Sequence, residues 1–248
     1  MVNATQDQFA AWGLKDLLLA NPELAIRPST NGELRIAGEF HFRARGKGVE
    51  IEDSYQIEVT VPGDFPRDLP RVNETGGRIP SDFHRYGDGS LCLGSPIRLA
   101  LMLKEGATLS EFTGRCLLPY LFAYSYKEKY GKLPFGELEH GQAGIVDDLR
   151  RMFRVDSEVQ VLQLLQLAGT QRRKANRPNC PCGSGQRVGK CHHRMLNRLR
   201  ARLGRLYCRA LHILLVDRGV REKQLRLLSP NGRAATPNLL LARMRTQP

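Results

Sequence analysis

The sequence lacks any apolar run of the roughly 18 residues that a membrane-spanning helix needs. Leu17, Leu18 and Leu19 near its start are too few for the apolar part of a signal peptide, and Asp7 precedes them. It shows no internal repeat, and no glycine-rich nucleotide fingerprint follows a predicted strand. We therefore expect a cytoplasmic protein without a membrane span and without a nucleotide-activating domain of its own.

The sequence has six cysteines in 248 residues. In the cytosol such thiols are more often catalytic or metal-bound than joined in disulfides. Cys116 and Cys208 lie within apolar helical patterns, so we expect both to be packing or surface thiols and not nucleophiles.

Acidic residues are few in the second part of the chain. Residues 1–150 carry 17 Lys/Arg against 21 Asp/Glu, a net −4, whereas residues 151–248 carry 21 against 4, a net +17. This split favours two modules. The basic part is suited to nucleic acid, an acidic protein or an anionic lipid. The alternative is a solvated basic helix with a disordered tail.

The first part of the chain predicts a helix and an antiparallel meander. Residues 5–19 form the helical pattern, and residues 23–27 and 33–43 alternate as strands around a favoured Asn31-Gly32 turn. Lys47 between two glycines predicts the next turn, and residues 49–61 the next strand.

Helices are predicted after the meander. Thr108 and Glu111 have the spacing of a capping box, and Pro119 is expected to kink or split the helix that they open. Residues 145–153 and 159–167 are helical, with Asp156 or Ser157 as the cap of the latter. Residues 192–215 predict a basic amphipathic helix with an apolar stripe of Leu196, Leu199, Leu203, Leu206 and Ile213.

The most informative stretch is residues 55–96. It begins as a half-buried strand, continues through Pro62, Pro66 and Pro70 as an extended segment, and ends with His84, a Gly-Asp-Gly turn and Cys92. From the residues alone, Cys92 is either a nucleophile presented after a tight turn or a buried thiol between two leucines. Asp88 is expected to form the turn, and the alternative is that it deprotonates an incoming lysine.

This order resembles the core of a ubiquitin-conjugating enzyme, in the shorter form of the bacterial branch. The matching residues are His84, Gly89, Leu91, Cys92 and Leu93, and a second similar stretch runs through residues 134–144 with His140. The resemblance implies an α+β UBC fold, with an N-terminal helix, a four-stranded antiparallel meander and helices after the cysteine. It implies Cys92 as the catalytic thiol, with His84 and His140 as further candidate catalytic residues. His84 is expected to orient the loop or to assist proton transfer, and His140 either locks its glycine-rich loop by a hydrogen bond or lies beside the active site. The chain departs from the eukaryotic pattern because Arg85 and Tyr86 replace the Pro-Asn pair.

The implied activity is acyl transfer through a thioester between Cys92 and the C-terminal glycine of a protein partner, which then passes to an amine. That partner would be a ubiquitin-like modifier or, in a bacterial antiphage system with cyclic-oligonucleotide signalling, a cGAS-like nucleotidyltransferase. A separate activating enzyme would supply the acyl group. The alternatives are a non-catalytic UBC-fold binding module and a nucleic-acid-binding protein that uses the basic part.

The second motif is NCPCGSGQRVGKCHH, residues 179–193. Three cysteines and a histidine at this spacing can surround one structural Zn²⁺ tetrahedrally. The stretch resembles the SEC-C motif, which assigns the ligands as Cys180, Cys182, Cys191 and His192, with His193 as a competitor for the fourth place. The sequence thus predicts a conjugating-like domain at 1–155, a helix and basic linker at 156–177, and a zinc module with a basic helix and tail at 178–248.

Overall fold

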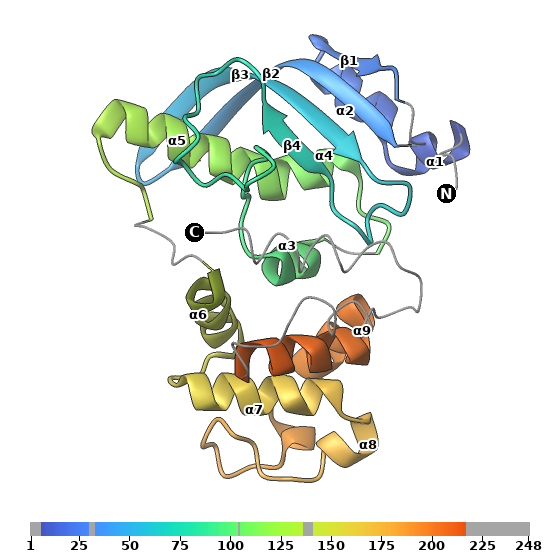
Figure 1. Cartoon of the computed structure of the whole chain (residues 1–248), viewed down its shortest axis with the longest axis vertical. Helices are drawn as coiled ribbons and strands as arrows, with labels where there is room; N and C mark the ends of the chain where they lie inside the picture. Colours follow the sequence, from blue (N-terminus) through green and yellow to red (C-terminus); the bar gives the residue numbers. More distant parts are fainter. Residues whose placement is uncertain (1–5, 30–32, 104, 136–140, 217–248) are drawn as a thin grey trace. The chain divides into compact units, whose positions relative to one another are not determined.

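The computed structural model describes residues 6–29, 33–103, 105–135 and 141–216. The chain divides into two compact units (Figure 1). The first comprises residues 1–94 and 102–137, and the second comprises residues 95–101 and 138–248. Within the described ranges, no helix combines the length and the apolar character that crossing a bilayer requires.

The first unit is built on a four-stranded antiparallel sheet in the order β1-β2-β3-β4. The strands are β1 Leu24–Arg27, β2 Leu34–Gly46, β3 Val49–Val61 and β4 Arg71–Glu74. Lys47 (φ 52°) and Gly48 (φ 79°) form the two-residue turn between β2 and β3, because a hairpin of this length favours positive φ at both positions. The α+β class and the antiparallel meander are confirmed. The residue pattern did not predict β4.

The N-terminal helix is interrupted, so the prediction of one helix over residues 5–19 is wrong. The structure has α1 at Gln6–Ala11 and α2 at Leu14–Ala20, separated by Gly13 with φ 65°. A Cβ on Gly13 would lie 3.2 Å from the Cβ of Thr108. The break thus lets the chain pass close to the start of α4 (Leu109–Phe112), where the Leu109 amide donates to the Trp12 carbonyl at 2.8 Å.

The helix opened by Thr108 has three parts: α4 at Leu109–Phe112, one π-helical stretch at Thr113–Leu117, and α5 at Leu118–Tyr130. The predicted capping box is present, since the Thr108 and Glu111 side chains accept each other's backbone amides. Pro119 lies in the first turn of α5, where its missing amide is tolerated. The π-helical stretch before Pro119 interrupts the α-helix, which is consistent with the expected split.

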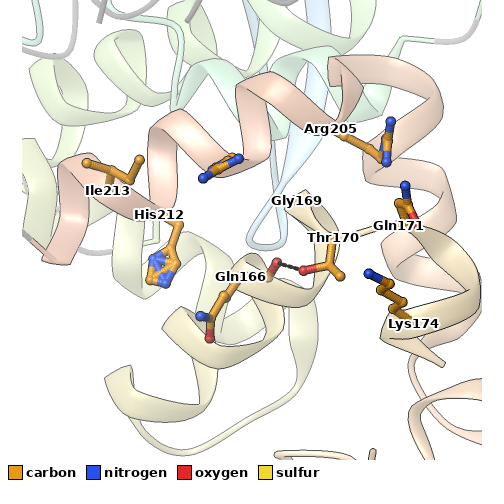
Figure 2. A pocket seen from close by; sticks show the side chains of 9 residues that line it. Gln166, Gly169, Thr170, Gln171, Lys174, Arg205, His212 and Ile213 are labelled. Carbon is orange, nitrogen blue, oxygen red and sulfur yellow. Dashed lines mark hydrogen bonds between the residues drawn. The ribbon is translucent and has the colours of Figure 1, made fainter. Parts of the chain in front are cut away.

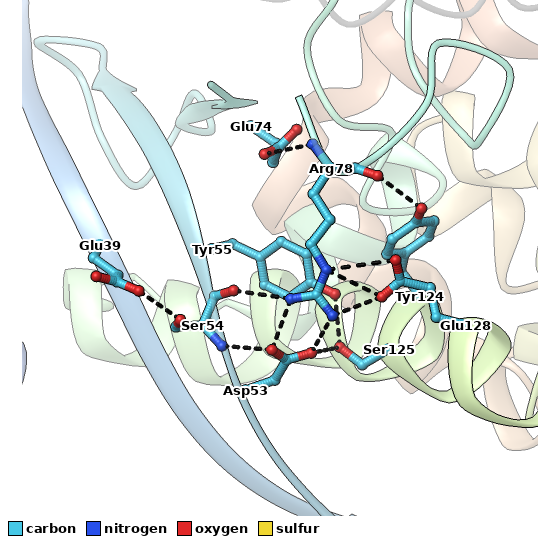
Figure 3. Close-up of polar contacts among 9 residues, drawn as sticks. All are labelled: Glu39, Asp53, Ser54, Tyr55, Glu74, Arg78, Tyr124, Ser125 and Glu128. Carbon is cyan, nitrogen blue, oxygen red and sulfur yellow. Dashed lines mark hydrogen bonds and ion pairs between the residues drawn. The ribbon is translucent and has the colours of Figure 1, made fainter. Parts of the chain in front are cut away.

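A polar network holds α5 against β3 (Figure 3). The Arg78 guanidinium donates to both carboxylate oxygens of Asp53 at 2.7 and 2.8 Å and to Glu128 at 2.6 Å, and it lies 4.5 Å above the Tyr55 ring. Burial raises the pKa of Asp53, but hydrogen bonds from Arg78 and Ser125 outweigh it and hold that pKa below its ordinary value. The network therefore locks the helix to the strand by ionised groups.

The second unit is helical. Its elements are α3 Pro96–Met102, α6 Gly141–Phe153, α7 Glu158–Gly169, α8 Arg172–Ala175, a 3₁₀ turn at Val188–Lys190, and α9 His193–Val216. Ser157 caps α7, so it is the cap among the two residues proposed. Buried Leu149 and Phe153 of α6 share one core with α7 and α9. α6 therefore groups with the second unit, whereas the sequence analysis placed residues up to 155 in the first domain.

The long helix α9 changes phase at Gly204, whose φ of 79° and ψ of 157° are not helical. Leu196, Leu199 and Leu203 are buried as predicted. After the glycine, however, Leu206 is 47% exposed, and the buried residues are Tyr207, Cys208, Ala210, Leu211, Leu214 and Leu215. The prediction of a single stripe through Leu206 is wrong because it assumed an unbroken 3.6-residue period.

Three arginines of α9 bond to the ends of neighbouring helices. Arg198 and Arg202 donate to the carbonyls of Leu101 and Ala100 at 2.6 and 2.8 Å, near the end of α3. Arg200 donates to two carbonyls near the end of α7, at 2.6 and 3.0 Å. Cations at helix C-termini satisfy otherwise unpaired carbonyls and oppose the helix dipole. These three basic residues therefore stabilise the packing of the helices in the second unit.

Candidate functional site

The stretch that contains Cys92 folds as a small hairpin. Arg85 and Leu91 form an antiparallel bridge, the Tyr86 amide donates to the Ser90 carbonyl at 2.8 Å, and the Cys92 amide donates to the His84 carbonyl at 2.7 Å. His84 and Cys92 are thus paired across the hairpin. The structure therefore brings together, at the level of the backbone, two residues that the sequence analysis assigned to one site.

The tip of the hairpin is a tight turn. The Gly89 amide donates to the Tyr86 carbonyl at 2.9 Å, and Gly89 has a φ of 80° that favours glycine. The Asp88 carboxylate accepts from the backbone amide of Ser90 at 3.0 Å and from its hydroxyl at 2.5 Å. These contacts give Asp88 the turn-forming role that was expected.

Two side chains anchor the hairpin, and the sequence analysis assigned a role to neither. The Tyr120 hydroxyl, from α5, donates to the carbonyls of Phe83 and His84 at 3.0 and 3.3 Å. Arg85 donates to Glu74 of β4 at 2.9 Å and to the carbonyls of Ile79 and Gly89 at 2.6 and 3.1 Å. Nothing in the residue spacing signals these contacts, because each joins positions far apart in the chain or across a turn.

His84 has a left-handed backbone, with φ 40°. Such a conformation costs on the order of 1–3 kcal/mol for a non-glycine residue and is kept only where its surroundings enforce it. Here the bonds from Cys92 and Tyr120 to the His84 carbonyl enforce it. The Cys92 amide is therefore engaged within the hairpin, and so it does not supply a hydrogen bond to a bound acyl group in this conformation.

Cys92 is a half-buried residue, whereas Cys116 and Cys208 are 2% and 0% exposed. Burial raises the pKa of Cys116 to about 11 and that of Cys208 to about 12. The expectation that these two are not nucleophiles agrees with their burial. No disulfide joins any of the six cysteines, all of which lie in the described ranges.

We expect this difference to appear in alkylation rates. The raised pKa values leave very little of Cys116 and Cys208 as thiolate at pH 8, and burial also shields both residues from the reagent. Cys92 should therefore react with iodoacetamide at least about 100-fold faster than either, measured by peptide mass spectrometry of the folded protein. The same reaction in urea, where all thiols are exposed, is the control. Equal rates for Cys92 and Cys116 in the folded protein would contradict the assignment.

A second constellation lies in the other unit. Cys180, Cys182, Cys191 and His192 offer one ligand atom each, and these atoms lie within 4.8 Å of one another. The His192 Nδ1 is 3.1 Å from the sulfurs of Cys180 and Cys191, and the sulfurs of Cys182 and Cys191 are 3.5 Å apart. The structure thus brings the predicted ligands together in a cluster that could hold a metal ion.

The backbone around this cluster curls tightly. The Cys180 amide donates to the Gln186 carbonyl at 2.7 Å, and the Gly183 amide donates back to the Cys180 carbonyl at 3.3 Å. Gly183 and Gly185 have φ values of 81° and 71°, which permit the curl without steric strain. These turns place the first two sulfurs toward Cys191 and His192, which precede α9.

The geometry distinguishes the two adjacent histidines. The His192 Nε2 lies 2.7 Å from the Phe153 carbonyl, so it carries the proton and donates, which leaves Nδ1 as the nitrogen that faces the sulfurs. His193 is outside the cluster, and its Nδ1 is buried without a hydrogen-bond partner among the described residues. His192 is therefore the fourth member of the group.

The surroundings of the cluster favour an anionic sulfur at one position, Cys182. Burial raises the pKa of Cys180. Burial acts in the same direction on Cys182, but hydrogen bonds from the Ser184 hydroxyl and backbone outweigh it, and the pKa of Cys182 is lowered to about 6. Since metal ligation requires thiolates, one ligand of the set is thus prepared for a cation.

His140, the third predicted catalytic residue, lies outside the described residues. Comparisons of the chain with protein-family models, with curated proteins and with solved structures find no match. The resemblances to ubiquitin-conjugating enzymes and to the SEC-C motif therefore stay predictions from the residues quoted above.

Proposed function

We propose that the first unit is a ubiquitin-conjugating-like transferase with Cys92 as its acyl-accepting thiol. The observation that carries this proposal is the contrast between Cys92, half-buried at the end of an anchored hairpin, and the fully buried Cys116 and Cys208. Its setting supports the proposal, because an antiparallel meander precedes the thiol and a helical layer follows it.

The reaction has two acyl transfers. The Cys92 thiolate attacks the carbonyl carbon of an activated C-terminal glycine, forms the C–S bond and expels the activating group. An amine then attacks the thioester, and the sulfur leaves as thiolate while the amine loses a proton. His84 is proposed as a residue that positions the hairpin, since its carbonyl holds the Cys92 amide. A separate protein supplies the activated acyl group.

The same proposal assigns a structural Zn²⁺ to the Cys/His cluster. Three sulfurs and one imidazole nitrogen form a closed four-ligand set, which is typical of structural zinc and leaves no position for substrate. An ion bound there would cross-link the loop to the start of α9 and would have no catalytic role. The Phe153 carbonyl would orient His192 and connect the site to α6.

The rival function is a binding module that holds a partner's tail without turnover. The two differ in one property: only the transferase needs the sulfur of Cys92. The test recovers the tagged chain from its native cells and compares wild type with Cys92→Ala on non-reducing gels. We expect a larger species that disappears in the variant and persists in Cys116→Ala, a matched change of a buried thiol. Equal partner recovery by wild type and Cys92→Ala, without any thiol-sensitive species, would favour the binding module.

A further inference from the structure

The second unit has an open cavity of about 600 Å³ between α7, α8 and the second half of α9 (Figure 2). None of its lining residues belongs to the Cys/His cluster. Its wall includes the cations Lys174, Arg205 and Arg209 and the neutral side chains of Gln166, Thr170, Gln171, His212 and Ile213. A cavity of this size is within the range of small-molecule sites, about 300–1,000 Å³.

The cations of this cavity are not committed to acidic partners. Residues 159–216 contain 12 Lys/Arg and no Asp or Glu. Three of these arginines donate hydrogen bonds to carbonyls at the ends of α3 and α7, as described above. In contrast, no described residue forms an ion pair or hydrogen bond with the side chains of Lys174, Arg205 or Arg209. Three positive charges therefore surround one cavity without a counter-charge from the described chain.

The positions of these residues follow from the local structure. Arg205, Arg209, His212 and Ile213 follow the spacing i, i+4, i+7 and i+8, so they share one face of α9 after its break at Gly204. Gly169, the last residue of α7, allows close approach to that face, since a Cβ on it would lie 3.1 Å from the Cα of Arg209. The cavity is thus a built feature of the packing of α7 on α9.

The two ends of the cavity differ in chemistry. Figure 2 shows Arg205 and Lys174 near Gln171 at one end, and His212 and Ile213 at the other, with Gln166 on the α7 side. His212 is neutral at physiological pH because burial lowers its pKa. Its Nδ1 is buried and lacks a hydrogen-bond partner among the described residues. One end is therefore cationic, and the other combines an aliphatic side chain with a neutral imidazole.

We propose that this cavity binds a phosphate-bearing ligand, with the phosphate at Arg205, Arg209 and Lys174 and an organic portion toward His212 and Ile213. A phosphate carries up to two charges and several acceptor oxygens, which match two guanidinium groups and one ammonium better than a single carboxylate does. The cavity volume exceeds that of a bare phosphate several times, which leaves room for the organic portion. Phosphate of a free small molecule and phosphate of a nucleic-acid backbone share this chemistry.

The test is calorimetric titration of the full chain, at a constant ionic strength of about 0.15 M, with adenosine diphosphate, inorganic phosphate and a short single-stranded DNA as probes. The double variant Arg205→Gln/Arg209→Gln should weaken adenosine diphosphate binding at least about tenfold. The matched control Arg173→Gln/Arg177→Gln removes the same charge from exposed residues outside the cavity and should change it less than about threefold.

The NMR signals of the His212 imidazole give an independent readout of ligand binding. The imidazole signals should shift on ligand addition in wild type and in Cys92→Ala, because the site does not depend on the thiol. If only DNA binding depends on the arginine pair, the cavity is still a phosphate-binding site, and the phosphate that it binds belongs to a polynucleotide. Equal weakening by the cavity pair and the control pair, or no binding of any probe by wild type, would overturn the proposal.

Discussion

Replacement of Cys191 by serine is expected to abolish zinc binding and to unfold the loop that carries the Cys/His cluster. The loop at residues 178–192 has few buried side chains of its own, with Cys180 and Val188 buried. Structural zinc contributes about 10–16 kcal/mol to the folding of small zinc peptides, which is comparable with the whole stability of a domain. Loss of one of four ligands should therefore cost several kcal/mol and should also loosen α6, which His192 contacts through the Phe153 carbonyl.

Metal analysis and hydrogen exchange measure this effect together. Wild type should carry one zinc per chain, and its Cys180 and Val188 amides, which donate to backbone carbonyls, should be protected. In Cys191→Ser, or after chelation, both the metal and the protection should be lost. Cys92→Ser is the matched control, because it changes a thiol outside the cluster. A chain that is purified without zinc and keeps full protection would refute the assignment.

The second large effect is expected at Arg85, which ties the Cys92 hairpin to β4. The side chain of Arg85 is 14% exposed and that of its partner Glu74 only 1%. Removing one member of a buried ion pair leaves the other charged and uncompensated, which costs about 3–5 kcal/mol. Arg85→Ala should therefore destabilise the first unit by this amount and should misplace Cys92.

A double variant separates this loss of charge pairing from a loss of packing. Glu74→Gln combined with Arg85→Ala removes the unpaired charge. The two Glu74 oxygens also accept from the Arg78 and Ile79 amides at 3.2 Å, and a glutamine can satisfy only one of them, so the recovery relative to Arg85→Ala alone should be partial, about 1 kcal/mol. The matched control is Arg71→Ala on β4, the strand of Glu74. Its ion pair with Glu33 is more exposed, at 34% and 30%, so its loss should cost less than about 1 kcal/mol. Urea titration measures all three. Equal effects of Arg85→Ala and Arg71→Ala would contradict the argument.

Local signals in the sequence predicted the elements whose causes are themselves local. The turn at Lys47 and Gly48, the strand β3 and the capping box of α4 depend on residues a few positions apart, and all three are confirmed. The Cys/His cluster also followed from spacing, since tight turns bring together ligands that lie within 13 residues of one another.

Long-range packing determined what the sequence analysis predicted wrongly. The break at Gly13 is coupled to the approach of Thr108, and the phase change at Gly204 redirected the buried face of α9. The grouping of α6 with the second unit depends on its contacts with α7 and α9, which no local pattern in the sequence encodes. The anchors of the Cys92 hairpin, Tyr120 and Arg85, were missed for the same reason.

The most direct measurement of the central claim is treatment of the Cys92-dependent species with neutral hydroxylamine, followed by mass spectrometry of the released partner. Hydroxylamine attacks a thioester carbonyl and leaves a hydroxamate on the acyl group, whereas it does not cleave a disulfide. Our account predicts a hydroxamate on the C-terminal glycine of the partner from wild type, and none from Cys92→Ala. A partner released from wild type with an unmodified C-terminus would contradict it.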